Sequence, residues 1–268
     1  MVKWVKIAAV LGALLAFAPS KLHALAIATS DLTVTTTIDS FSIDPVANGT
    51  TVFTEGVVLP DDPGLADTLQ DIINCVIVPA PLPFGTATIA MGSASIDSVT
   101  ASSGPSSTTQ SMPTNASASF PGDAGIAVAA TDGYMEIDNS AGLSAITVSI
   151  TVDFGYSLSA SITEFYEYAE SLISQSTSFD IDGVEQSYGI FEFSRVIADS
   201  VGDGLVTDAF TGSETFLITI DPGSTLEVYS ISDSQSLATA VSEPSSLYIF
   251  AMMSGGVVMI RRRLKTAT

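Results

Sequence analysis

The sequence has very few basic residues, 8 lysines and arginines against 29 aspartates and glutamates. Arg195 is the only base between Asp31 and Glu243, and all 29 acidic residues lie in that stretch, so its formal net charge is 1 − 29 = −28. A field of this sign repels nucleic acid and anionic lipid. The composition therefore excludes a nucleic-acid partner, and it favours solubility and the binding of cations.

Histidine, tryptophan and cysteine occur once each, as His23, Trp4 and Cys75. A lone cysteine cannot form an intramolecular disulfide, and we expect Cys75 to be a small buried residue. The segment containing His23 and Trp4 is interpreted below as removable. The remaining chain then has no histidine, and no lysine before its C-terminal tail. This excludes Ser-His-Asp and Ser-Lys hydrolysis, histidine-ligated zinc and phosphate-loop chemistry. Acid–base catalysis by two carboxylates remains, but 29 candidates single out no catalytic residue.

The first 26 residues have the three parts of a signal peptide. Lys3 and Lys6 give a positive n-region, residues 7–18 form an apolar h-region, and Ala24-Leu25-Ala26 provides the small-x-small pattern that signal peptidase recognises. The apolar run is short for a membrane span. We expect a signal peptide over residues 1–26, cleaved after Ala26 or alternatively after Ala24; a retained amphipathic anchor is the other interpretation.

The other end of the chain has an uncharged segment, Leu247–Ile260, followed by Arg261, Arg262 and Arg263. A helix of this length is short for a hydrocarbon core of about 30 Å, and snorkelling arginines with bilayer thinning would let it fit. The positive-inside rule keeps these arginines and the N-terminal lysines in the cytoplasm. We therefore expect one transmembrane helix over residues 246–260 and a translocated ectodomain before it.

Ser242, Glu243 and Pro244 precede this helix, and residues 242–265 resemble the PEP-CTERM sorting signal of exopolysaccharide-producing Gram-negative bacteria. That signal has a Pro-Glu-Pro motif, a short transmembrane helix and a basic cluster, and the membrane transpeptidase exosortase reads it. Glu243 and Pro244 match the motif, whereas Ser242 replaces its first proline, which bears on processing efficiency. The resemblance implies export across the inner membrane, transient anchoring, and transfer to the cell surface or extracellular matrix. An uncleaved tail anchor is the alternative.

The middle of the chain has the periodicity of strands. From Ile146 to Leu158 apolar residues alternate strictly with smaller or polar ones, which predicts one long half-buried strand, or two joined at Gly155. Glu164–Ile173 fits both periods, and its tyrosines favour a strand. Leu65–Val76 has a helical apolar face. The other strand candidates are Leu32–Ile38, Thr86–Met91, Tyr134–Ile137, Ser187–Phe193, Thr215–Ile220 and Leu226–Ile231.

Many short strands separated by turn residues are typical of an antiparallel β-sandwich or jelly roll. We therefore expect an all-β ectodomain over residues 27–231. Residues 100–119 are rich in Ser and Thr and read as a mobile excursion, and residues 232–241 read as a polar stalk before the anchor. The expected turns are Asp132-Gly133, Asp182-Gly183, Asp203-Gly204 and Asp221-Pro222-Gly223.

Calcium is the metal that suits the remaining side chains, because it takes carboxylate and carbonyl oxygens. The candidate ligands are Asp180 with Asp182, and Asp199 with Asp203 and Asp208. Neither group has the spacing of an EF-hand loop, and Asp-Gly pairs are also ordinary hairpin turns. A Ca²⁺ site is thus a hypothesis, with plain turns as its alternative.

Sugar binding would need an aromatic platform, for which Tyr166, Tyr168 and Tyr188 are the candidates and core packing the alternative. From charge and the implied destination, we expect a non-enzymatic surface or matrix protein associated with exopolysaccharide, with signal peptidase and exosortase as partners during export. The rivals are a secreted carboxylate-dependent glycosidase or polysaccharide lyase, and a lectin-like module. A cleft with two close carboxylates would favour the enzyme, and exposed coplanar tyrosines the lectin.

Overall fold

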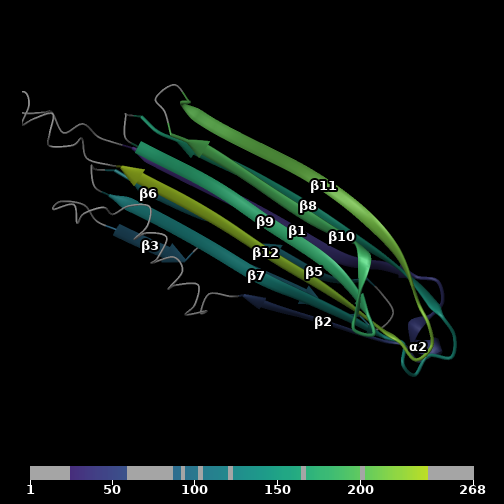
Figure 1. The fold of residues 1–268 in the computed structure, drawn as a ribbon. Coiled ribbons are helices and arrows are strands. Elements are labelled where there is room, and N and C mark those ends of the chain that lie inside the picture. Colours follow the sequence, from purple (N-terminus) through teal and green to yellow (C-terminus); the bar gives the residue numbers. More distant parts are fainter. Residues whose placement is uncertain are drawn as a thin grey trace, which may run out of the picture.

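The computed structural model describes residues 25–58, 87–91, 94–101, 105–119, 123–163, 167–199 and 203–240. They form two facing six-stranded sheets and one short helix, α2 (Pro45–Asn48) (Figure 1). The strands are β1 (Ala26–Phe41), β2 (Thr51–Val58), β3 (Ala87–Met91), β4 (Ser95–Val99), β5 (Ser106–Ser111), β6 (Thr114–Ala118), β7 (Ala124–Asp138), β8 (Ile146–Ser161), β9 (Glu167–Ile181), β10 (Val184–Ala198), β11 (Leu205–Ile220) and β12 (Thr225–Ala240).

Several sequence predictions lie outside the described residues. The signal peptide is described only from Leu25 onward, and the tail with its transmembrane segment not at all. Ala26 is the first residue of β1, so cleavage after it would remove a single strand residue. The predictions outside the described part are Ala24, the helix Leu65–Val76, Cys75, Tyr166, the motif Ser242, Glu243 and Pro244, and the basic cluster Arg261, Arg262 and Arg263.

Sheet A has the order β11-β8-β1-β5-β4, with β6 also paired to β1, and sheet B has the order β10-β9-β12-β7-β2, with β3 also paired to β7. All these pairs are antiparallel except β3 with β7. β5 and β6 follow one another along the same edge of β1, and β2 and β3 do so along β7. The prediction of an all-β fold with two antiparallel sheets is confirmed at this level.

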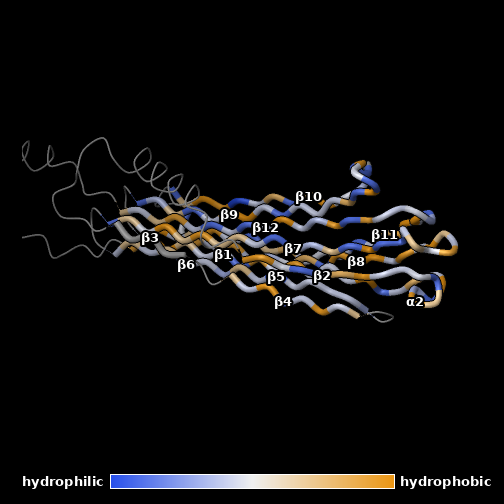
Figure 2. Tube along the Cα trace, turned by 90° about the horizontal axis from the view of Figure 1, so that it is seen from below, coloured by the Kyte–Doolittle hydropathy of each residue, from blue (hydrophilic) through white to orange (hydrophobic). Residues whose placement is uncertain are grey.

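Seven of the described strands contain 15 or 16 residues, so the sandwich is a rod roughly 50 Å long at the usual rise of about 3.3 Å per residue. β8 runs from Ile146 to Ser161 without a break at Gly155, and the other predicted strands all fall within observed ones where they are described. The segment after Glu164 is also a strand, β9. Figure 2 shows the elongated shape from below, with hydrophobic and hydrophilic residues alternating along the strands.

The prediction of a mobile excursion over residues 100–119 is wrong for its described part. β5 and β6 lie there, paired to β1, and the inward side chains of β5, Ser106, Thr108 and Gln110, are at most 1% exposed. The composition is that of a loop, but hydroxyl side chains occupy alternate positions and find partners inside the sandwich. A polar composition is compatible with a strand when its buried hydroxyls are hydrogen-bonded.

The predicted stalk over residues 232–241 is also wrong up to Ala240. This segment is the second half of β12, the central strand of sheet B, with Ser232, Ser234 and Ser236 buried against sheet A. Asp132-Gly133 is likewise no turn, since it lies within β7. A Cβ on Gly133 would stand 3.3 Å from Gln110 Nε2, so the glycine makes room for a buried side chain.

Hydrogen bonds between small polar side chains link the two sheets in their interior. Ser30 Oγ of β1 bonds to Ser234 Oγ at 2.6 Å and to Thr114 Oγ1 at 2.5 Å, and Ser236 Oγ lies 2.7 Å from Thr114 Oγ1. Gln110 of sheet A donates to the Ser230 carbonyl of sheet B at 2.8 Å. Apolar side chains surround this polar band, with alanines at the end where β1 begins and larger side chains at the other end. Those larger buried side chains include Ile137, Ile146, Phe179, Ile218, Ile220 and Leu226.

Both ends of the described chain lie at one end of the rod. At the start of the described chain Ala26 pairs with Ala118, and at its end the Ala240 N–H donates to the Asp123 carbonyl. Ser30, close to the start, contacts Ser234, close to the end. The opposite end, here called the distal end, holds α2 and three strand connections (Figure 1). Those connections are residues 139–145, 182–183 and 221–224.

Asn139 ties the distal connections together. It is fully buried, its Oδ1 accepts from Asn48 Nδ2 and Thr50 Oγ1 at 2.8 Å each, and its Nδ2 donates to the carbonyls of Ser144, Ile220 and Asp221 at 3.1 Å. One amide therefore satisfies groups from three segments of the chain.

We predict that Asn139→Ala lowers the free energy of unfolding by about 2–4 kcal/mol, because it leaves several buried donors and acceptors unpaired. Urea unfolding followed by circular dichroism measures the change. Asn115→Ala, at an exposed position on β6, is the matched control and should change the free energy by less than about 0.5 kcal/mol. Equal effects for the two variants would contradict this role for Asn139.

Candidate binding surface on sheet B

The outer face of sheet B, toward the distal end, carries aromatic and acidic side chains in adjacent rows. The strand register puts Phe53 of β2 beside Glu136 of β7, and Glu136 beside Glu227 of β12. In the next row Tyr134 of β7 lies beside Tyr229 of β12. These residues occupy outward positions because their sequence neighbours on both sides point into the core.

The aromatic rings of this face touch one another. Tyr134 and Tyr229 have ring centroids 5.2 Å apart, and Phe53 and Tyr134 6.4 Å apart. Phe53 is 48% exposed and Tyr229 39% exposed, so the cluster is open to solvent. These rings therefore lie on the surface and outside the core, and exposed apolar clusters of this kind are candidates for binding surfaces.

The exposed apolar surface continues across the sheet beyond these rings. Val57, Ile231 and Phe191 lie in one transverse row, and Phe193 follows on β10; all four are between 46% and 72% exposed. Asp132 interrupts this row between Val57 and Ile231. Its Oδ1 is buried without a hydrogen-bond partner, and burial raises the pKa of its carboxyl.

Tyr134 links two carboxylates that stand directly opposite each other. Its hydroxyl lies 2.8 Å from Glu136 Oε2 and 2.9 Å from Glu227 Oε1, so these two oxygens are at most 5.7 Å apart. Burial, and then the hydrogen bonds and charges of both glutamates, raise the pKa of the Tyr134 phenol far above its ordinary value. The phenol therefore stays protonated and shares one hydrogen between two acceptors, which eases the repulsion of the opposed like charges.

A groove of about 440 Å³ continues from these glutamates to the distal end. Hydrogen bonds from Ser140 lower the pKa of Asp138, and hydrogen bonds from Ser224 and the Thr225 N–H lower the pKa of Asp182. Both carboxylates are therefore fixed in place and ionised at neutral pH. The residues lining the groove are Glu136, Asp138, Ser140, Asp182, Gly183, Thr225 and Glu227.

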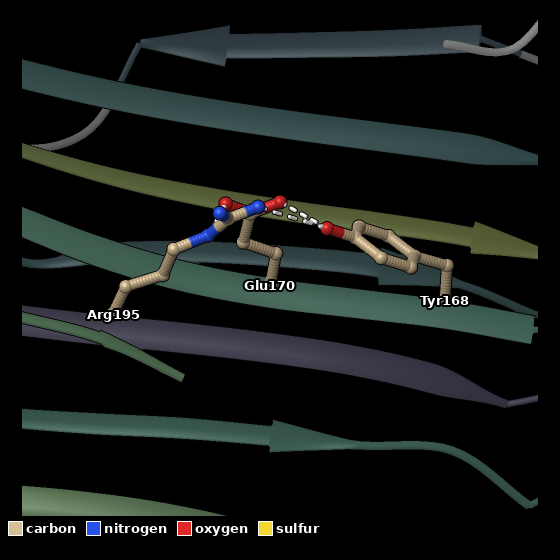
Figure 3. Close-up of polar contacts among 3 residues, drawn as sticks. All are labelled: Tyr168, Glu170 and Arg195. Atoms are coloured by element: carbon tan, nitrogen blue, oxygen red, sulfur yellow. Dashed lines mark hydrogen bonds and ion pairs between the residues drawn. The ribbon is translucent and has the colours of Figure 1, made fainter. Parts of the chain in front are cut away.

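A second polar cluster occupies the other half of this face, on β9 and β10 (Figure 3). Arg195 pairs through Nε with Glu170, the Tyr168 hydroxyl donates to the same carboxylate, and Arg195 Nη2 lies 3.4 Å from the Tyr168 oxygen. Burial, and then the contacts with Glu170, raise the pKa of Tyr168 to about 12. The single base between Asp31 and Glu243 is thus already engaged by a carboxylate.

The predicted calcium ligands do not converge. Asp182 and Gly183 form the two-residue turn between β9 and β10, with positive φ of 55° and 79°, which is the turn that the sequence predicts as the alternative to a calcium site. Asp180 lies on the outer face of β9 at this distal end. Asp199 and Asp203 lie in the connection at the opposite end, where Asp203 Oδ2 accepts from the Asp199 N–H at 3.2 Å. No group of three or more potential ligands suited to a metal occurs among the described residues.

Asp208, the last of these candidates, has a different role. It extends from the edge strand β11 to the facing sheet, accepting from Ser194 at 2.5 Å and from Tyr156 at 3.2 Å. The Ser194 hydrogen bond is the main cause of its lowered pKa. Asp208 therefore bridges the two sheets at their open side.

The tyrosines singled out from the sequence are not those of the exposed aromatic cluster. Tyr188 packs against Phe216 and Phe179, with centroids 6.1 and 5.6 Å away, and Tyr168 belongs to the arginine cluster. The cluster uses Tyr134 and Tyr229 instead. The alternation of the predicted strands indicates that both point outward, but their proximity depends on a strand register that the sequence does not state.

Scans of this chain against protein-family models, curated proteins and solved structures find no match. Among the described residues, no helix is long and apolar enough to cross a membrane. The function is therefore inferred from the geometry of this face and from the sequence signals at the two ends.

We predict that Asp132→Asn stabilises the protein at pH 7. The pKa of Asp132 is raised in the folded state, so its ionisation opposes folding as pH rises through that pKa, and the amide removes this cost. The expected result is a melting temperature a few degrees higher at pH 7, with the gain shrinking as the pH falls through the range where the carboxyl takes up its proton. Asp31→Asn, on the exposed outer face of sheet A, is the control; an equal gain there would mean that only the overall charge matters.

Proposed function

We propose that this chain is an exported, non-enzymatic surface or matrix protein, sorted by an exosortase, that binds exopolysaccharide on the outer face of sheet B. The observation that carries the proposal is the exposed cluster of Phe53, Tyr134 and Tyr229 beside the carboxylates of Glu136 and Glu227. Aromatic rings stack on the C–H faces of sugar rings, and carboxylates accept hydrogen bonds from sugar hydroxyls.

The shape of the molecule supports the proposed location. The described chain leaves the rod at Ala240, at the same end where it enters at Leu25. A protein attached through a tail beyond residue 240 would therefore present its distal end, roughly 50 Å away, to the outside. The aromatic and acidic rows lie toward that distal end, where an external polymer is most accessible.

The chemistry of the face favours a ligand rich in hydroxyl groups. Its charged groups around the aromatic cluster are hydrogen-bond acceptors, and the one described arginine is paired with Glu170. Calcium enters the proposal as a diffuse counter-ion that screens the acidic surface and links it to anionic polysaccharide. It is not proposed as a resident ion.

A carboxylate-dependent glycosidase is the second candidate, favoured by one observation. The Glu136 and Glu227 oxygens that flank Tyr134 are at most 5.7 Å apart, a bound that is compatible with the separation of about 5–5.5 Å in retaining enzymes. However, the Tyr134 hydroxyl fills the space between them, where the glycosidic bond would have to lie. The binding role is therefore the better supported of the two.

The sorting part of the proposal predicts the mass of the protein recovered from the surface and medium of its native host. The expected species begins near Ile27 and ends between residues 242 and 246, with or without added mass from the transpeptidation. Intact-mass spectrometry of each cell fraction measures it. A species that retains Arg261, Arg262 and Arg263 and occurs only in the inner membrane would overturn sorting and leave an uncleaved anchor.

The binding part predicts that Phe53→Ala and Tyr229→Ala each weaken binding to purified host exopolysaccharide by at least about fivefold, through lost stacking of about 1 kcal/mol. Titration calorimetry measures affinity, with Leu143→Ala, 83% exposed at the distal end, as the control. Unchanged affinity in both aromatic variants would exclude this face.

New reducing ends that appear with the unaltered chain and vanish with Glu136→Gln would establish the glycosidase instead.

A further inference from the structure

β11 is a long edge strand whose second side is unpaired among the described residues. It forms the end of sheet A and pairs along all 16 of its residues with β8 (Figure 1). The backbone N–H and C=O groups on its other side therefore have no ladder partner in the part of the chain that the structure describes. Such an edge is a template for pairing with another strand, and natural proteins usually protect it.

The outward side chains of β11 do not protect it. Its charged residues, Asp208 and Glu214, share the inward positions, and Asp208 is held by Ser194 and Tyr156. The outward positions carry no charge, no proline and no lysine, and two of them are leucines exposed to 67% and 75%. The outward residues are Leu205, Thr207, Ala209, Thr211, Ser213, Thr215, Leu217 and Thr219.

The other described edges are short or irregular in register, whereas β11 is neither. β10 has an irregular register between Glu185 and Gly189 and carries Arg195 on its outer face. β3, β4 and β6 have only five residues each, and β2 has eight, with Glu55 among its exposed positions. Short length, bulges and charges are the devices that block edge-to-edge pairing. β11 carries two carboxylates, but it has neither a short length nor an irregular register, and this distinguishes it from the other described edges.

We infer that β11 pairs with β11 of a second copy of this chain, antiparallel and about a two-fold axis near Ser213. This register places Phe210 opposite Phe216 and Asp208 opposite Ile218, so no two carboxylates face each other across the new ladder. An axis at Thr211 would instead place Asp208 opposite Glu214. A two-fold axis perpendicular to the sheet joins the two copies of sheet A into one larger sheet with the same face outward. Both copies then use the same strand, so assembly stops at the dimer.

The acidic charge makes this contact dependent on salt. Two copies with a net charge of −28 each between Asp31 and Glu243 repel one another over distances longer than the strand contact. Added salt screens this repulsion but leaves backbone hydrogen bonds and apolar contacts in place. The dimer should therefore strengthen as ionic strength rises, the opposite of an association based on salt bridges.

Cysteine crosslinking of the full chain tests the pairing directly. In a Cys75→Ser background, Ser213→Cys should form a disulfide-linked dimer under mild oxidation at least tenfold faster than Thr33→Cys, on the central strand of the same face. Thr211→Cys should react more slowly than Ser213→Cys, because residue 211 does not face itself in this register. Equal rates at Ser213 and Thr33 would overturn the inference.

Sedimentation equilibrium provides the second measurement. The mass should double at about 0.5 M salt and shift toward the monomer at about 0.05 M, where the Debye length is longer. Ser213→Glu should remain monomeric, whereas Ser157→Glu on the neighbouring strand should dimerise like the unaltered chain. Both substitutions place a carboxylate opposite an existing one, Asp153 and Asp31 respectively, so they form a matched pair. A monomeric mass at every ionic strength would overturn the inference.

Discussion

The structure depends on hydrogen bonds between hydroxyl and amide side chains that join the two sheets in their interior. In most sandwiches interdigitating apolar side chains fill the space between the sheets. Here Ser30 contacts Thr114 and Ser234, and Gln110 reaches Ser230 of the facing sheet. A buried hydroxyl costs free energy unless it is paired, so these contacts require β12 and β1 to face each other in one register. The polar band thereby fixes the alignment of the two sheets along the rod.

This constraint also explains where the sequence was informative. Where inward positions are large and apolar, as from Ile146 to Leu158, alternation predicted the strand. In β5 and at the end of β12 the inward positions are serine, threonine or glutamine, so inward and outward side chains are similarly polar. Hydropathy then does not alternate along these strands, and the sequence predicts a loop and a stalk in their place. Pairing partners lie about a hundred residues apart, so the meeting of Tyr134 with Tyr229 could not be predicted from either strand alone.

The outer face of sheet B departs from what stability alone would select. Glu136 and Glu227 are opposed across neighbouring strands, and Asp132 has a buried oxygen without a partner in an apolar row. Each arrangement costs free energy that a neutral residue would not. Local departures of this kind are expected at functional sites, where binding is favoured at some cost in stability. Their concentration on one face, beside exposed aromatic rings, is the structural argument for binding there.

The binding face and the proposed dimer contact belong to different sheets, so neither obstructs the other. An antiparallel pairing of β11 points the two distal ends in opposite directions. Two copies anchored side by side in one membrane share one orientation and cannot form it. Copies released from the membrane can, and so can copies on two apposed surfaces. Release by an exosortase and pairing through β11 would then be successive steps, and the paired rods would present a polysaccharide-binding end in each direction.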